Sequence, residues 1–218
     1  WGNDLRPTFA DAVRAISNLA MAINTHTGIT AHVDRHLFLD SQELFRTPFV
    51  YITADRAFEL TERESKNLGE YMRRGGFVFA DNAVPTLEYG PAEASLRQMF
   101  RDALGPQARF RPIPNTHPIY HCFYDFDGPP AGQEIGTTAT VAYLKPVFTP
   151  TPVHFLEGIF LGDRLVGIYS DKGYCHMWAK NFGNEPQLRF GINVVIFALT
   201  QKGSIAQQQI DFFSQIGQ

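Results

Sequence analysis

One stretch in the first half of the chain constrains the fold more than any other, because two continuous apolar segments lie on either side of a helical pattern. The segments are 48–53 (PFVYIT) and 77–80 (FVFA). Continuous apolar strands are typical of parallel sheets that are covered on both faces. Between them, Thr61 and Glu64 have the spacing of a capping box, and two adjacent glycines end the helix. The sequence therefore predicts a strand–helix–strand unit with parallel strands.

The same rules predict the other elements. Apolar residues recur three or four positions apart in several segments, which indicates amphipathic helices. Thr8 and Asp11 have the spacing of a capping box at the start of the first helix. Two apolar segments flank Gly162-Asp163, which is a hairpin signal. The predicted helices span 9–23, 92–104, 187–200 and 204–216, the predicted hairpin spans 155–169, and further strands are predicted at 29–33 and 110–113.

The length and the proline distribution define the domain organisation. A chain of 218 residues suits one domain, residues 1–218. Residues 114–152 hold seven of the fourteen prolines and show little periodicity. Loops of this length are usually functional or mobile. We therefore expect an α/β domain with a mostly parallel sheet and a long irregular insert at 114–152, with one short hairpin at 138–144.

Composition excludes several classes of partner. The net charge is −3 and there is no basic run, which argues against a nucleic-acid surface. No stretch of 18 apolar residues is present, so we expect no transmembrane segment. The chain begins at Trp1 without an initiator methionine, which suggests a mature form, a processed fragment or a trimmed chain, and any signal peptide would not be visible. Cys122 and Cys175 are too few for a disulfide framework, and they either pair with each other or remain free thiols.

Polar residues follow three predicted strands at the position where ligands bind in open parallel sheets, beyond the carboxyl ends of the strands. Asp81 follows the strand at 77–80, where a carboxylate can hold a ligand hydroxyl, a cation or a backbone amide. The alternative is that Asp81 or Asn82 caps the turn or the next helix. The candidate ligand-binding residues are Thr53, Asp55, Asp81, Asn82, Ser170 and Asp171.

No complete catalytic or metal-binding set is apparent. There is no paired CxxC, HExxH, GxSxG, P-loop or GxGxxG motif, so we expect no metal and no cofactor. Adjacent residues of an extended segment point in opposite directions, so Cys175 would need His117 or His121 as its base rather than its neighbour. The candidate catalytic residues are Asp81, His117 and His176, and the metal candidates considered are His117, His121, Cys122, Cys175 and His176.

Several segments are similar to a known family. In order along the chain they are WGND, FRTPFVYITADRAFELTERESKNLGEYMRRGGFVFADNA, THPIYHCFYDFDG, LEGIFLGDRLVGIYS and LRFGINVVIFALT. They resemble the bacterial domain-of-unknown-function family 4159, and the resemblance spans nearly the whole chain. The family is grouped with the class I glutamine amidotransferase-like superfamily, which implies a flavodoxin-like, three-layer αβα sandwich. The family has no established activity. The resemblance implies a bacterial protein that is often exported, for example to the periplasm, or membrane-associated in its full-length form.

The resemblance also permits a test at one residue. Active members of the superfamily place a nucleophilic cysteine at a strand exit in the middle of the sheet. The segment GGFVFADNA resembles that position, and Asp81 stands where the cysteine would be. A carboxylate cannot perform the thiolate chemistry of glutamine hydrolysis. We therefore expect no amidotransferase activity.

Two functional hypotheses follow. The first is a non-catalytic ligand-binding or assembly module, whose small molecule or protein partner binds over the candidate residues under the insert at 114–152. The second is a hydrolase that acts on a sugar or an amide and uses Asp81 with His117 or His176 as an acid/base pair.

Overall fold

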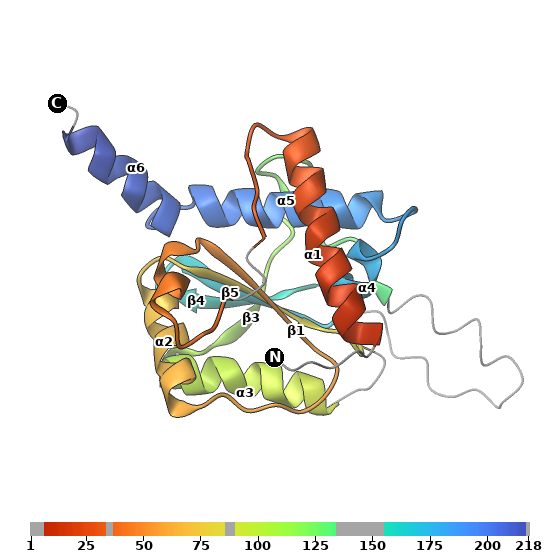
Figure 1. The fold of residues 1–218 in the computed structure, drawn as a ribbon, viewed down its shortest axis with the longest axis horizontal. Coiled ribbons are helices and arrows are strands. Elements are labelled where there is room, and N and C mark those ends of the chain that lie inside the picture. The colour runs from red at the N-terminus through yellow and green to blue at the C-terminus, as the bar shows by residue number, and fades with distance from the viewer. Residues whose placement is uncertain (1–6, 34–36, 86–89, 134–154, 217–218) are drawn as a thin grey trace, which may run out of the picture.

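The computed structural model describes residues 7–33, 37–85, 90–133 and 155–216, and these form an α/β fold around one open sheet (Figure 1). The strand order is β1-β2-β5-β4-β3. The first three strands in this order run parallel, while β4 is antiparallel to both of its neighbours. The predicted α/β class with a mostly parallel sheet is thus confirmed. The strands are β1 (Phe49–Ala54), β2 (Phe77–Asn82), β3 (Phe110–Pro112), β4 (Glu157–Leu161) and β5 (Arg164–Ser170).

The predicted strand–helix–strand unit is present as β1, α2 (Glu62–Arg73) and β2. β1 and β2 are parallel, with Phe49 opposite Phe77. The capping box begins α2 as expected, because the Thr61 hydroxyl accepts a hydrogen bond from the Glu64 backbone N–H and the Glu64 carboxylate accepts one from the Thr61 N–H. The predicted hairpin is also confirmed as β4 and β5.

Helices pack on both faces of the sheet, which explains why β2 is apolar at consecutive positions (Figure 1). Phe77 and Phe79 pack on the side of α1, α4 and α5, whereas Val78 and Ala80 pack on the side of α2 and α3. A strand that is buried on both faces gains from apolar side chains at every position. The remaining helices are α1 (Pro7–His26), α3 (Pro91–Leu104), α4 (Tyr174–Trp178), α5 (Glu185–Thr200) and α6 (Ile205–Ile216).

The strand predicted at 29–33 is wrong, since this segment has no regular secondary structure. The amide side chain of Asn24 in α1 accepts a hydrogen bond from the Ala31 N–H at 2.7 Å and donates one to the Ala31 carbonyl at 3.2 Å. The polar backbone groups of Ala31 are therefore satisfied by a helix side chain instead of a neighbouring strand. The apolar side chains of Ile29 and Ala31 still pack against the core.

The described part of the predicted insert, residues 114–133, is irregular but closely packed on α5. The buried Asn193 side chain donates hydrogen bonds to the carbonyls of Ile119 and Tyr124 and accepts one from the Tyr124 N–H. The Asn193 side chain therefore provides hydrogen-bond partners that these backbone groups would otherwise have in a strand or a helix. The hairpin predicted at 138–144 lies outside the described residues.

Gly69 allows α2 and α3 to pack closely, and its replacement is expected to destabilise the protein. A Cβ atom at Gly69 would lie 1.9 Å from the backbone oxygen of Ala103 in α3. Gly69→Ala would force the helices apart and should lower the free energy of unfolding by about 2 kcal/mol, measured by urea denaturation. The control is Gly28→Ala, because a Cβ at Gly28 meets nothing within 4 Å. Equal effects of the two substitutions would contradict the close approach.

Candidate functional site

Asp81 lies at the carboxyl edge of the sheet, by which we mean the end where β1, β2 and β5 terminate. Its side chain is 0% exposed, and its Cα is paired with Thr53 of β1 and Ser170 of β5. Asp81 and Asn82 were predicted to follow the strand, but the pairing with β1 continues as far as Ala54 and Asn82. Asp81 is therefore part of the central strand rather than of a loop beyond it.

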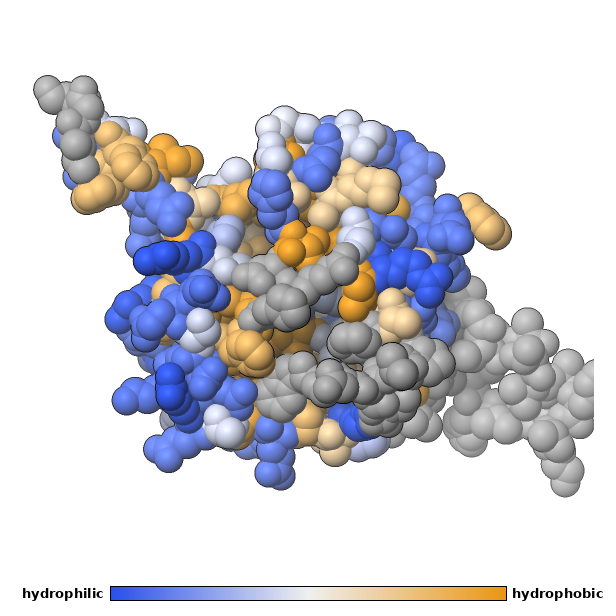
Figure 2. Space-filling model, in the orientation of Figure 1, coloured by the Kyte–Doolittle hydropathy of each residue, from blue (hydrophilic) through white to orange (hydrophobic). Residues whose placement is uncertain are grey.

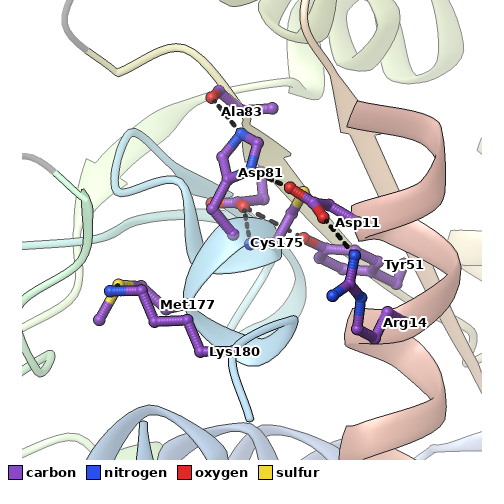
Figure 3. Close-up of polar contacts among 9 residues, drawn as sticks. Asp11, Arg14, Tyr51, Asp81, Ala83, Cys175, Met177 and Lys180 are labelled. Carbon is purple, nitrogen blue, oxygen red and sulfur yellow. Dashed lines mark hydrogen bonds and ion pairs between the residues drawn. The ribbon is translucent and has the colours of Figure 1, made fainter. Parts of the chain in front are cut away.

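Both carboxylate oxygens of Asp81 accept hydrogen bonds, and Figure 3 shows the two bonds from Tyr51 and Cys175. The Ser170 hydroxyl donates to Oδ1 at 2.7 Å. The Tyr51 hydroxyl at 3.1 Å and the Cys175 backbone N–H at 2.9 Å both donate to Oδ2. The three donors belong to β1, β5 and α4. One buried side chain thus joins three elements that are far apart in the sequence.

The bond to Cys175 makes Asp81 a cap for the first turn of α4. The N–H groups of a first helical turn have no partner within the helix, and a carboxylate is a favourable acceptor for them. Gly173 precedes the helix with a φ of +62°. Asn82 fulfils the alternative role of capping a turn, because its Oδ1 accepts a hydrogen bond from the Val84 N–H at 3.0 Å. The capping alternative therefore describes the contact of Asn82 with the turn, whereas Asp81 caps α4, a helix 94 positions away, and not α3, the next helix along the chain.

The helix α4 itself was not predicted. Cys175 and His176 were interpreted as extended, and this interpretation is wrong. A helix of five residues is too short to produce a 3.6-residue periodicity. Its capping carboxylate, Asp81, lies 94 positions away in the sequence. No local pattern could have revealed it.

Burial raises the pKa values of both Asp81 and Cys175. Burial raises the pKa of Asp81 to about 6, although hydrogen bonds from the Cys175 N–H and Ser170 act in the opposite direction. Burial and the neighbouring Asp81 charge raise the pKa of the Cys175 thiol well above its usual range. The thiol is therefore protonated at neutral pH and is a poor nucleophile.

The raised pKa of Asp81 predicts that stability falls as the pH rises from about 4 to about 6. In this window the native state retains a proton that the unfolded chain, with the usual value of 3.8, has released. Each increase in pH then favours the unfolded state. Between pH 4 and pH 7, the free energy of unfolding of the wild type relative to Asp81→Asn should decrease by about 2 kcal/mol. Urea denaturation at a series of pH values measures this difference. A pH-independent difference would contradict the assignment.

A second polar cluster lies on the opposite face of the sheet. The Asn82 amide donates to the Asp171 carboxylate at 2.6 Å, and the Tyr169 hydroxyl donates to the same oxygen at 3.2 Å. Arg97 lies over the Tyr169 ring at 4.3 Å and contacts the Glu157 carboxylate at 2.5 Å. Burial raises the pKa of Asp171 above its usual value. Asn82 and Asp171 thus lie on the α2–α3 side of the sheet, and Asp81 lies on the α4 side.

The six candidate ligand-binding residues all lie at the carboxyl edge, but they differ in accessibility. Asp81, Asn82 and Ser170 are buried, whereas Thr53, Asp55 and Asp171 are partly exposed. The Thr53 hydroxyl donates to the Asp81 carbonyl, and the Asp55 carboxylate pairs with Arg56 at 3.0 Å. The edge therefore has a buried polar base and a partly exposed acidic rim, which we define as Asp55 and Asp171.

His176 lies in α4 beside Cys175 but binds groups other than Asp81. Its Nδ1 lies 2.9 Å from the carboxylate of Asp11, and its Nε2 lies 3.0 Å from the carbonyl oxygen of Ala83. Asp11 was missed as a site residue. It was assigned to a capping box with Thr8, whereas Thr8 lies inside α1. Asp11 and His176 are 165 positions apart, so no sequence signal connects them.

His117 is not brought next to Asp81. Its ring lies 5.2 Å from the ring of Phe197, and Phe197 also contacts Phe77, the first residue of β2. Asp81 is four residues further along the strand, which corresponds to about 13 Å. The His117 Nδ1 accepts a hydrogen bond from the Ile119 N–H, so this histidine caps a 3₁₀ turn. Burial lowers the pKa of the His117 side chain.

The remaining cysteine and histidine candidates are dispersed. Cys122 and Cys175 are both free thiols, and the Cys122 thiol donates to the Asn193 carbonyl at 3.2 Å. The exposed His121 pairs with Asp125 at 3.0 Å. Within the described ranges, no group of three or more His, Cys, Asp or Glu side chains is arranged to hold a metal ion.

Fold and site together define an α/β protein with a mostly parallel open sheet and a buried, fully hydrogen-bonded carboxylate at the carboxyl edge. The chain matches the model of the family described as "Domain of unknown function (DUF4159)" over residues 6–199, and it belongs to this family. A search of curated proteins found no match. In the part of the chain that the structure describes, no helix combines the length and the apolar character needed to cross a membrane.

Proposed function

We propose that this chain is a non-catalytic ligand-binding or assembly module built on a flavodoxin-like, three-layer αβα sandwich of the amidotransferase-like type. The packing of helices on both faces of the sheet supports this fold. The observation that carries the functional proposal is the set of three hydrogen bonds to Asp81. A carboxylate with both oxygens occupied and no solvent exposure holds the structure together and is not available to a substrate.

The state of the nearest thiol supports the absence of amidotransferase chemistry. The sequence resemblance implies that Asp81 stands where active members of the superfamily carry a nucleophilic cysteine. Cys175 lies next to this position in space, but it is 0% exposed and its pKa is raised. Nucleophilic catalysis requires an accessible thiolate. The Cys175 thiol is neither accessible nor deprotonated at neutral pH.

The binding proposal depends on the acidic rim. Asp55 and Asp171 are partly exposed at the edge where open parallel sheets bind ligands. The described part of the insert reaches the same edge, because the Gln133 N–H donates to the Lys172 carbonyl at 2.7 Å and the Tyr174 hydroxyl donates to the Pro130 carbonyl. Carboxylates recognise hydroxyl and cationic groups, so a small molecule with hydroxyl or amine groups is the expected ligand class.

A thermal-shift screen with polyols, sugars and amines tests the binding proposal. A ligand at about 100 times its dissociation constant adds about 2.7 kcal/mol, which raises the melting temperature by roughly 5–10 °C in a chain of this size. The shift should be lost in Asp55→Asn or Asp171→Asn. It should persist in Asp163→Asn, which changes an exposed carboxylate in the β4–β5 turn at the opposite edge. A shift that both rim variants retain would refute this site.

Reactivity of Cys175 tests the absence of thiol chemistry. In the native protein, iodoacetamide should leave Cys175 unmodified, and labelling should occur only after denaturation, because the thiol is buried and protonated. Peptide mass spectrometry distinguishes Cys175 from the half-buried Cys122. Rapid labelling of native Cys175 at neutral pH would indicate an accessible thiolate and would contradict the non-catalytic assignment.

One observation favours the alternative hydrolase. The Asp11 carboxylate and the His176 ring form a 2.9 Å pair, as a general base and its orienting acid do. The Nε2 atom that would face a substrate is, however, bound to the Ala83 carbonyl. Hydrolysis of chromogenic glycoside or amide substrates that is lost in both Asp81→Asn and His176→Gln would establish this alternative and overturn the non-catalytic proposal.

A further inference from the structure

The second half of α6 extends away from the body of the protein with its apolar side chains exposed (Figures 1 and 2). The first turn is anchored, since Ile205 is 7% exposed and its N–H donates to the Gly75 carbonyl. Further along, Ile210, Phe212 and Phe213 are 59%, 59% and 71% exposed. A helix of 12 residues is marginal in water without packing of its apolar face. This ridge, defined as Ile210, Phe212 and Phe213, therefore requires a partner surface.

A hollow suited to such a ridge lies beside it on the same molecule. The cavity has a volume of about 540 Å³ and is lined by Phe45 and Arg74 on one side and by α6 on the other. Two residues of the ridge, Phe212 and Phe213, are part of the α6 wall. The Arg74 guanidinium lies over the Phe45 ring at 5.2 Å. The exposed apolar face of α6 thus provides both a protruding ridge and one wall of the hollow. An interface between two identical surfaces requires this combination, because each copy must supply a protruding part and a recessed part.

The charged residues of α6 and of the hollow also favour a second copy of the chain as the partner. Asp211 is the charged residue of α6, and the helix contains no Lys or Arg. Helices that bind anionic membrane surfaces are rich in Lys and Arg, so α6 lacks the features of a membrane-surface helix. Arg74, in the hollow, has a side chain that is 62% exposed and pairs with Glu70 at 2.7 Å. In a two-fold arrangement, Asp211 of each copy can meet Arg74 of the other.

We propose that the chain forms a two-fold symmetric dimer in which the α6 ridge of each copy packs into the hollow beside Phe45 and Arg74 of the other. This inference specifies the partner for the assembly role proposed above. The proposed interface is formed by residues near Gly75, at the edge of the sheet where β2 begins, whereas the acidic rim lies at the opposite edge. A failure of ligand binding at the rim would therefore leave the dimer intact, and the reverse also holds.

Sedimentation velocity and light scattering over a range of concentrations provide the first test. The wild type should have about twice the 24.5 kDa mass of one chain. Phe213→Asp should raise the dimer dissociation constant at least about thirtyfold, because a charge would then enter the apolar contact. The matched control is Phe182→Asp, at a phenylalanine that is 85% exposed in the loop before α5, and it should leave the dimer unchanged.

A charge exchange provides the second test. Asp211→Arg and Arg74→Asp should each raise the dissociation constant about tenfold, and the double variant should recover most of the loss. Circular dichroism establishes that each variant is folded. A wild type that is monomeric at every concentration, or equal effects of Phe213→Asp and Phe182→Asp, overturns the proposal. Binding of the wild type to anionic vesicles, lost in Phe213→Asp, also overturns it and assigns the ridge to a lipid surface.

Discussion

Replacing Asp81 with alanine is expected to lower the free energy of unfolding by about 4 kcal/mol at pH 5. The substitution leaves three buried donors without their acceptor: the hydroxyls of Tyr51 and Ser170 and the backbone N–H of Cys175. An unsatisfied buried donor costs about 1–3 kcal/mol, and the two hydroxyls can rotate toward other acceptors whereas the amide cannot. Urea denaturation followed by circular dichroism measures the change.

The effect of this substitution should depend on pH in a direction set by the pKa. At pH 7 the wild type carries the cost of a buried charge on Asp81, so the loss in Asp81→Ala should be about 1 kcal/mol smaller than at pH 5. The control is Asp55→Ala, whose partly exposed carboxylate pairs with the exposed Arg56, and its effect should stay within about 0.5 kcal/mol. If Asp81→Ala were as mild as this control, Asp81 would not hold the three elements together.

Replacing Trp178 with alanine is expected to cost about 4 kcal/mol, because the side chain fills the space between α4 and the sheet. Trp178 is 0% exposed. Its ring lies 5.2 Å from that of Tyr51, 5.7 Å from that of Phe79 and 5.9 Å from that of Tyr174. Its Nε1–H donates to the Gln187 carbonyl at 2.8 Å. The substitution removes the packing and this hydrogen bond together.

Two further variants separate these contributions. Trp178→Phe retains an aromatic ring but cannot donate to the Gln187 carbonyl, so it should cost about 1–2 kcal/mol less than Trp178→Ala. Phe182→Ala removes an aromatic side chain that is 85% exposed and should change stability by no more than about 0.5 kcal/mol. A small effect of Trp178→Ala in urea denaturation would mean that α4 is not required for the stability of the sheet.

Elements with strong local signals were predicted correctly. The β1–α2–β2 unit has continuous apolar strands, a capping box at Thr61 and a glycine with a φ of +107° after the helix. Each signal acts within a few residues, so local physics decides the outcome. The segment at 29–33 (ITAHV) has apolar residues at alternate positions, but the backbone groups of Ala31 are hydrogen-bonded by the Asn24 side chain instead of a neighbouring strand. An apolar pattern predicts burial, and it does not reveal which groups satisfy the backbone.

The candidate site was predicted in part. The rule that ligands bind beyond the carboxyl ends of parallel strands located Thr53, Asp81 and Ser170 at one edge, and the sheet brings their backbones into register. The contacts of these residues were not predictable, because they depend on the placement of β5 beside β2. These two strands are separated by α3, β3 and β4 in the sequence. The Asp11–His176 pair was missed because its two residues, in α1 and α4, are 165 positions apart in the sequence.

The sequence alone determined the α/β class, the parallel β1–β2 pair, the hairpin and the membership of Asp81 in the carboxyl edge. These features follow from periodicity, capping and turn chemistry, all of which act between residues that are close in the chain. Only the tertiary structure decided that Asp81 is buried, that its donors are Tyr51, Ser170 and the Cys175 N–H, and that α4 exists as a helix. The physical reason is that hydrogen bonding and desolvation at Asp81 arise from groups about 30 to 94 positions away, which only the folded chain brings together.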